Sequence, residues 1–286
     1  MIGHERLGIQ NLVVGPDGKQ FAAQLVTRNG AQIWVGDAER SVMTQLTRGA
    51  LDAIGPVWSP DGRSVAFTSE ASGNESTYLQ PADGSKQPEI FFHDANREFR
   101  ICSWSADGSS MFVESNVKGG RLRGEIWLID VATRKARLLL TDPTANLRSP
   151  VLSPDGRWLA YVSDESGSND IYVRPYPSLD RKWQISQSGT LTQSNFFALS
   201  ATTYMPHWRN DGREILFVTL DGLIDAVSIE TQGEVLTAAP QRIVFKPSFP
   251  LMSLAPTPDH SKFLVAIVPG DVTSEPIRVV LNSNRQ

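Results

Sequence analysis

A short segment with an aspartate at its turn recurs six times in the 286 residues, and it predicts an all-β fold, a six-bladed β-propeller. Five of the six aspartates are followed by glycine. The repeated aspartates are Asp17, Asp61, Asp107, Asp155, Asp211 and Asp259. Successive aspartates lie 44 to 56 residues apart. That period is typical of four-stranded units closed into a ring, whereas a β-helix has a shorter one.

The Asp-Gly pair is predicted to join the first and second strands of each unit. Asp-Gly between alternating apolar residues is the strongest short-range hairpin signal. In the second unit it connects residues 56–58 to residues 65–68. We expect a turn in which both central residues have positive φ.

The second strands carry apolar residues on both faces, which indicates sheets covered on both sides. A third strand follows in every unit, and a fourth strand follows in five of them. We therefore expect four-stranded antiparallel blades in one domain covering residues 1–286. The expected blades are residues 7–47, 54–93, 101–141, 149–186, 205–245 and 251–282.

The last unit stops after its third strand, so the last blade is expected to be incomplete. Propellers commonly close by borrowing a strand from the other terminus, but residues 1–6 are short and polar. Two alternatives stay open: a last blade of three strands, or a natural chain that continues upstream of Met1.

Charge and hydropathy exclude two classes of partner. The net charge is −4, so the chain lacks the basic surface that binds nucleic acid. No stretch approaches the ~18–20 apolar residues of a membrane-spanning helix, and we expect no direct membrane insertion. The first ten residues lack the apolar region of a secretory signal. The chain is either cytosolic, or a mature chain or fragment whose targeting segment lies elsewhere.

The residues that most often carry chemistry are sparse. Cys102 is the only cysteine, so no internal disulfide can form, and we expect a small buried side chain rather than a nucleophile. No two histidines have metal-ligand spacing. The histidines are His4, His93, His207 and His260.

Three repeated or clustered sets of side chains are better explained by structure than by ligands. The six turn aspartates lie on separate units, too far apart to share one ion, and aspartate bonds its own turn backbone. The loop from Asp164 to Asp170 is rich in oxygen ligands but lacks the calcium-loop pattern. We expect no cofactor, with calcium at Asp164 and Asp170 as the less favoured alternative. Three tryptophans at one repeat position are expected to pack between blades: Trp58, Trp104 and Trp208.

The break in the repeat spacing before Asp211 marks the predicted binding face. The 56 residues from Asp155 to Asp211 include about ten extra, in a loop that contains Phe196, Phe197 and Tyr204. Such a loop either forms an exposed apolar patch or folds back over the channel. Three further residues are candidates for the same face. They are Arg100 and Arg148, expected just before first strands, and His207, expected at the channel mouth.

The repeat resembles the TolB-type, WD40-like (PD40) β-propeller repeats of bacteria. The best copy is LSPDGRWLAYVSDESGSNDIYVRPYP at residues 152–177, and the resemblance extends from about Leu7 to Asn282. This copy and the terminal PIRVVLN are also similar to the C-terminal propellers of bacterial serine/threonine protein kinases. The sequence itself contains no kinase motif. The resemblance implies an interaction or sensing module, periplasmic or otherwise extracytoplasmic.

Two functions follow as hypotheses. The first is a non-catalytic, monomeric module that binds a protein or peptide, as part of a larger signalling or envelope protein. The alternative is a lyase or hydrolase with a polar or metal site at the channel mouth. Some pectate-degrading lyases with this type of propeller use histidines and a metal, and the few histidines here count against that alternative. No serine-hydrolase elbow, Walker or Rossmann pattern is present. Fold alone does not decide between the two hypotheses.

Overall fold

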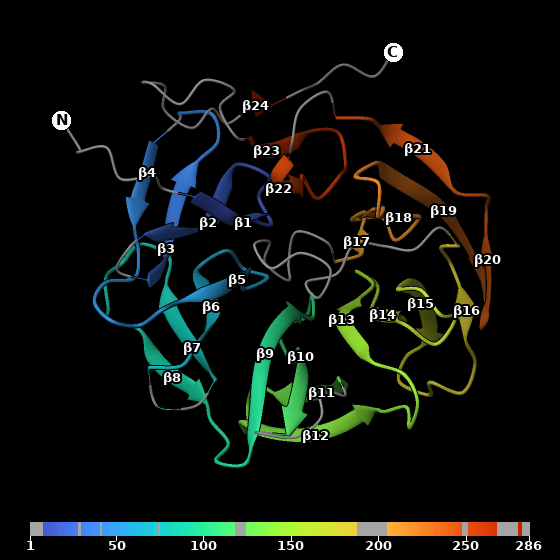
Figure 1. Ribbon diagram of the computed structural model, residues 1–286, viewed down its shortest axis with the longest axis horizontal. Helices are drawn as coiled ribbons and strands as arrows, with labels where there is room; N and C mark the ends of the chain where they lie inside the picture. The colour runs from blue at the N-terminus through green and yellow to red at the C-terminus, as the bar shows by residue number, and fades with distance from the viewer. Residues whose placement is uncertain are drawn as a thin grey trace.

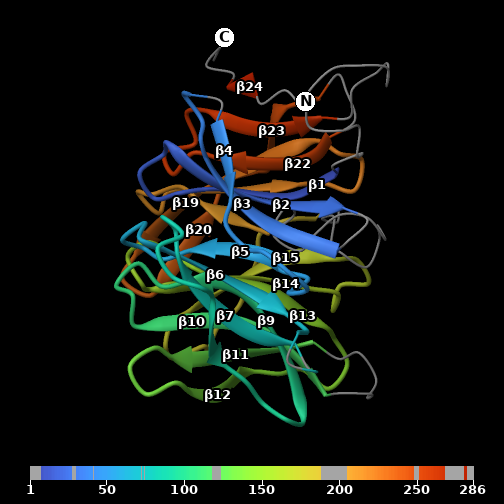
Figure 2. The same ribbon diagram turned by 90° about the vertical axis from the view of Figure 1, so that its left-hand side faces the viewer.

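Antiparallel β-sheets surround a common axis, and the strands of each sheet follow one another outward from it (Figure 1). The side view shows the sheets stacked around this axis (Figure 2). The computed structural model describes residues 8–27, 30–40, 42–71, 73, 75–117, 124–187, 205–247, 251–267 and 280–281. Within these residues the strands form six sheets. We number the sheets in chain order.

The first three sheets contain four strands each. The first sheet contains β1 (Gly8–Val14), β2 (Gln20–Thr27), β3 (Gly30–Asp37) and β4 (Val42–Gln45). The second sheet contains β5 (Ile54–Trp58), β6 (Ser64–Ser69), β7 (Ser76–Pro81) and β8 (Glu89–Phe92). The third sheet contains β9 (Arg97–Trp104), β10 (Ser110–Val117), β11 (Glu125–Asp130) and β12 (Lys135–Leu140).

The last three sheets differ in strand number. The fourth sheet contains β13 (Leu147–Leu152), β14 (Trp158–Ser163), β15 (Asp170–Pro175) and β16 (Trp183–Gln184). The fifth sheet contains β17 (His207–Trp208), β18 (Glu214–Val218), β19 (Ile224–Gln232), β20 (Val235–Ala238) and β21 (Arg242–Phe245). The sixth sheet contains β22 (Leu251–Pro256), β23 (Phe263–Ile267) and β24 (Val280–Leu281).

The four-stranded antiparallel blade of a propeller is confirmed, whereas the number of complete blades is five rather than six. Five sheets have at least four strands, and the sixth has three. The fifth sheet has an extra hairpin, because β19 is long enough to pair with β21 near its start and with β20 near its end. The sequence did not predict this extra strand.

All six Asp turns have the same hydrogen bond, but their backbone differs from the predicted one. Each aspartate accepts the backbone N–H two residues later, at 2.9–3.1 Å. In the second turn the Gly62 N–H bonds the Ser59 carbonyl at 2.9 Å, and Gly62 has φ of 69° while Asp61 stays outside the positive region. Pro60 therefore occupies the position that proline favours in a type I turn, and glycine follows it. The expectation of positive φ at both central residues was wrong.

Apolar side chains from both faces of each sheet fill the seams between neighbouring sheets. Between the fourth and fifth sheets, Trp158 and Val173 pack with Phe217. Trp58 and Trp208 are buried, and each indole N–H points to a carbonyl of the preceding sheet. The predicted packing role is confirmed for Trp58 and Trp208, and Trp104 is partly buried against a cluster from the second and third sheets.

The first and sixth sheets pack against each other and close the ring (Figure 1). Ile9, Leu12 and Phe21 of the first sheet lie in one buried cluster with Leu264 and Ala266 of the sixth. Within the residues described, no strand is exchanged between these two sheets. Side-chain packing makes this closure.

A buried charged group joins the fifth and sixth sheets on the turn side. His260 takes the place of the turn glycine with φ of 56°, and its Nδ1 lies 3.0 Å from Oε1 of Glu214. The Glu214 carboxylate also pairs with Arg242 and lies 3.8 Å from Arg209. Burial lowers the pKa of His260, and the bond to Glu214 offsets this only in part. The departure of the sixth turn from glycine therefore supplies a seam contact.

No helix that the structure describes has the length and hydropathy to cross a membrane.

Candidate functional site

The predicted site residues that the structure describes all lie on the first strands of their sheets, around the axis (Figure 1). Arg100 is inside β9 and Arg148 is inside β13, so the expectation that they precede these strands was wrong. Both lie seven residues before their turn aspartate, and they are therefore equivalent in the repeat. His207 begins β17 and lies only four residues before Asp211, nearer the turns. Phe196, Phe197 and Tyr204 lie outside the described residues.

Arg100 is held between two carboxylates from different sheets. Its Nη2 donates to Oε1 of Glu75 at 2.5 Å, and its Nη1 lies 3.8 Å from Oε1 of Glu114. The exposed fractions of these side chains are 26% for Arg100, 10% for Glu75 and 12% for Glu114. Burial by itself would lower the pKa of the Arg100 guanidinium, but the two carboxylates outweigh burial and raise it. The arginine therefore stays charged and fixed in direction.

Ser149 of the fourth sheet also contacts one of these two carboxylates. The Ser149 N–H donates to Oε2 of Glu114 at 3.3 Å, and Ser149 has φ of 52°. Its neighbour Arg148 is half-buried, and the aliphatic stem of Arg148 lies against Gly124. Among the described residues, Arg148 forms no ion pair. We call Glu75, Arg100, Glu114, Arg148 and Ser149 the channel cluster.

Cys102 lies beside the channel cluster but does not act as a thiolate. The thiol is buried and its Sγ lies 3.6 Å from the Arg100 carbonyl. Burial and the nearby Glu114 carboxylate raise the pKa of Cys102 well above its usual range. The thiol is therefore protonated at neutral pH and a poor nucleophile. The prediction of a small, buried cysteine is confirmed.

The oxygen-rich loop before β15 turns its carboxylates toward protein donors. Asp170 is buried and accepts from Ser166, Ser168 and Ser186 at 2.6–2.9 Å. Asp164 accepts from the backbone and side-chain nitrogens of Asn146 at 2.7 and 2.6 Å. These bonds make the loop a polar hairpin that is tied to the chain before β13.

No three His, Cys, Asp or Glu side chains gather at one point in a way that could hold a metal, in the part of the chain that is described.

The sequence missed the two carboxylates of the channel cluster. Glu114 lies seven residues after its turn aspartate, where the other units have uncharged residues: Gln24, Thr68, Val162, Val218 and Ala266. A charge in that position is a signal that could have been read. Glu75 comes from the loop before β7, and no repeat position marks it.

Comparison with known proteins finds similarity to a family over part of the chain. Residues 13–123 match the model of the TolB β-propeller domain family. A peptidase of Bacillus subtilis, YuxL, is 25% identical over 183 residues, which are 50% of this chain and 27% of the peptidase. The Tol-Pal system protein TolB of Thioalkalivibrio sulfidiphilus is 35% identical over 69 residues, 23% of this chain and 16% of that protein. The chain thus spans only a minor part of these relatives.

Solved structures of similar fold have lower sequence identity. TolB from Acinetobacter baumannii superposes with a TM-score of 0.60 at 16% identity, covering 92% of this chain and 58% of that one. Oligogalacturonate lyase from Vibrio parahaemolyticus superposes with a TM-score of 0.57 at 11% identity, covering 92% and 87%. At such identities the likeness concerns the fold alone. The predicted TolB-type resemblance is confirmed, while the similarity to kinase propellers stays a prediction.

Proposed function

We propose that this TolB-type β-propeller, in which the family match covers residues 13–123, is a non-catalytic module that binds a protein or peptide partner. The binding site is the channel cluster. One observation carries the proposal: two arginines at equivalent positions of neighbouring first strands differ in their partners. Arg100 is locked by two carboxylates, while Arg148 has no ion-pair partner among the described residues.

This difference suits recognition better than folding alone. Arg100 needs no reordering when a partner arrives, and binding to such a preordered group costs less side-chain entropy. Arg148 supplies a positive charge and a planar guanidinium that bonds carboxylates in a bidentate manner. A carboxylate or backbone carbonyl of the partner is the natural acceptor for it.

The remaining features of the module are proposed with the site. Phe196, Phe197 and Tyr204 would add apolar contacts, and His207 would add a polar contact nearer the turns. The β22–β24 sheet would serve as the sixth blade of a single domain. The module would act as a monomer without cofactor or nucleic acid. Its setting would be extracytoplasmic, within a larger signalling or envelope protein.

The test compares the proteins that bind to the purified chain with those that bind to its Arg148→Ala variant. A captured protein is identified, purified separately and titrated into the chain by calorimetry. We expect 1:1 binding that weakens at least tenfold in Arg148→Ala. The control is Arg134→Ala. Arg134 lies in the turn between β11 and β12, is 51% exposed and pairs with Glu89 of β8. That variant is expected to bind as the original chain does.

Equal affinity of the Arg148→Ala variant and the original chain would contradict the proposed site. The alternative hypothesis, an enzyme at the channel mouth, predicts a different result. Stoichiometric metal in the purified protein, measured by atomic emission, would favour that alternative over the binding module.

A further inference from the structure

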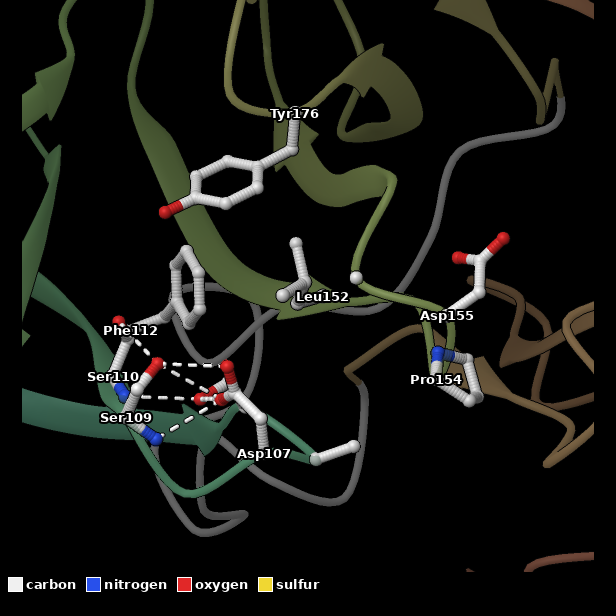
Figure 3. Close-up of a pocket in the computed structure, with 11 residues that line it drawn as sticks. Asp107, Ser109, Ser110, Phe112, Leu152, Pro154, Asp155 and Tyr176 are labelled. Atoms are coloured by element: carbon white, nitrogen blue, oxygen red, sulfur yellow. Dashed lines mark hydrogen bonds between the residues drawn. The ribbon is translucent and has the colours of Figure 1, made fainter. Parts of the chain in front are cut away.

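A pocket of about 170 Å³ lies between the third and fourth sheets on the side of the Asp turns, away from the channel cluster (Figure 3). Two equivalent turns and the segment after β15 form it. Its lining residues include Ala106, Asp107, Phe112, Leu152, Asp155, Gly156 and Tyr176. The pocket is independent of the function proposed above.

The turn at this seam has Ala106 before its aspartate, whereas four of the six repeats have proline there. At three other seams the proline before the turn aspartate covers the glycine of the next turn. A methyl group on that glycine would lie 3.4 to 3.7 Å from the proline ring. These pairs are Pro16 with Gly62, Pro60 with Gly108, and Pro258 with Gly18.

The third turn has Ala106 at this position, and nothing lies within 4 Å of the corresponding point on Gly156. Gly212 of the fifth turn is also uncovered, although Pro154 precedes it, so the proline contact is made at three seams. The methyl group of Ala106 leaves space above Gly156. Ala106 and Gly156 both line the resulting pocket.

One wall of the pocket is apolar and partly aromatic. The Phe112 ring is buried, and the Tyr176 ring lies 5.7 Å from it at an interplanar angle of 71°. Figure 3 shows Leu152 beside these two rings. An aliphatic chain can pack against this wall, and the face of Tyr176 can attract a cation.

The rim of the pocket is negative. Asp107 and Asp155 come from the two turns, and within the described residues neither takes part in an ion pair. Asp107 accepts the Ser105 hydroxyl at 2.6 Å, and that bond with those from Ser109 lowers its pKa. Asp155 accepts the Ser153 hydroxyl at 2.5 Å. Two carboxylates thus flank an apolar space.

We propose that this seam pocket binds an arginine side chain of a protein or peptide. The aliphatic stem of the arginine packs against Leu152 and Phe112. The guanidinium lies over Tyr176 and is attracted by the negative charge that Asp107 and Asp155 place at the rim. The pocket combines the two environments that such a side chain needs, an apolar wall for its stem and negative charge for its head.

The experiment is an NMR titration of the ¹⁵N-labelled chain with the peptide acetyl-Gly-Arg-Gly-amide. The citrulline peptide of the same length is the neutral control, because citrulline keeps the planar head and stem. We expect the arginine peptide to shift the amide signals of Ala106 and Gly156 in a saturable way. The citrulline peptide should bind at least fivefold more weakly.

Two variants test the assignment by separate routes. Ala106→Pro introduces the proline found in four of the other turns and should abolish binding while leaving both carboxylates in place. Asp155→Asn keeps an acceptor for the turn and should weaken binding at least fivefold. Asp61→Asn makes the same change in the second turn and should leave binding unchanged.

Equal binding of the arginine and citrulline peptides would overturn the proposal. Undiminished binding to the Ala106→Pro variant would overturn it as well. The spectrum of each variant in the absence of peptide shows whether the chain is folded, so a folding defect is not mistaken for lost binding.

Discussion

Arg100 is the residue on which the charges of the channel cluster depend. It neutralises Glu75 and Glu114, which are nearly buried and come from the second and third sheets. Removal of the arginine leaves two carboxylates close together in a site of low polarity. An unpaired buried charge costs more than the original pair contributed.

We therefore expect Arg100→Gln to lower the free energy of unfolding by about 1–3 kcal/mol. Urea denaturation followed by tryptophan fluorescence measures this change. The matched control is Arg134→Gln, whose pair with Glu89 is 51% and 64% exposed. Exposed pairs contribute about 0–1 kcal/mol, so a loss in Arg134→Gln as large as in Arg100→Gln would contradict this account.

His260 makes stability depend on pH. Burial lowers its pKa from 6.5, so below pH 6.5 the unfolded chain takes up a proton that the folded chain resists. The bonds from His260 and Arg242 outweigh burial at Glu214 and lower its pKa from 4.5, which adds a loss of the same sign at lower pH. Stability is therefore present above pH 6.5 and lost as the pH falls.

The expected slope near pH 6 is positive and smaller than one proton, which would be about 1.4 kcal/mol for each pH unit. Urea unfolding at pH 8, 7, 6 and 5 measures it. His260→Asn keeps a donor for Glu214 and tolerates the left-handed backbone, but it does not titrate. The pH dependence between 8 and 5 should be smaller in this variant, and an unchanged dependence would show that other groups cause it.

The turns are the elements whose backbone conformation depends most on the local sequence. The third turn has the same bonds as the second, since Gly108 N–H bonds the Ser105 carbonyl at 2.9 Å and Ser105 N–H bonds the Ser110 carbonyl at 2.8 Å. A proline fits this backbone in the second turn at Pro60. The backbone of Ala106 should therefore accept one.

Ala106→Pro is expected to raise the free energy of unfolding by about 0.4–1 kcal/mol, because it restricts the unfolded chain. The fifth turn offers the contrasting substitution. The Asn210 N–H bonds the Pro258 carbonyl of the next turn at 2.8 Å, so Asn210→Pro removes a hydrogen bond. We expect that variant to lose about 1 kcal/mol. Urea midpoints that shift in the same direction for both variants would contradict this explanation.

Sequence predicted the strands and turns well because their signals are local. The adjacent pair Asp61 and Gly62 indicates a hairpin without reference to the rest of the fold. Apolar residues on both faces of β6 indicate a sheet covered on both sides. The turn type was wrong because Asp-Gly occurs in several kinds of turn, and Pro60 was the residue that distinguished them.

The sites were harder to predict because they form between sheets. Glu75 and Arg100 are 25 residues apart, and nothing in the repeat shows that they meet. Ala106 was visible as a departure from proline, but its meaning depends on the seam with Gly156. The channel cluster and the seam pocket depend on contacts between repeats, and the sequence of a single repeat does not show these contacts.

The whole molecule depends on the seam between its first and sixth sheets. Leu264 is fully buried there and packs with Phe21, as residues at the internal seams do. If the ring is one cooperative unit, truncation at this seam costs as much as at any other.

Leu264→Ala should lower the free energy of unfolding by about 2–5 kcal/mol, similar to Ile215→Ala between the fourth and fifth sheets. Ile243→Ala, at a position 62% exposed on β21, is the control and should cost little. Chemical denaturation of the three variants decides the matter. A cost for Leu264→Ala no greater than that of the control would mean that the sixth sheet folds apart from the ring.

The closure described for the first and sixth sheets also sets where the ring can open. Apolar side chains hold these two sheets together, and among the described residues no backbone hydrogen bond crosses between them. The two sheets can therefore separate without breaking any strand pairing, and this separation exposes apolar side chains on both sheets. A partner with an apolar face could then pack between the first and sixth sheets. The joint that completes the propeller is thus also a place where it can open.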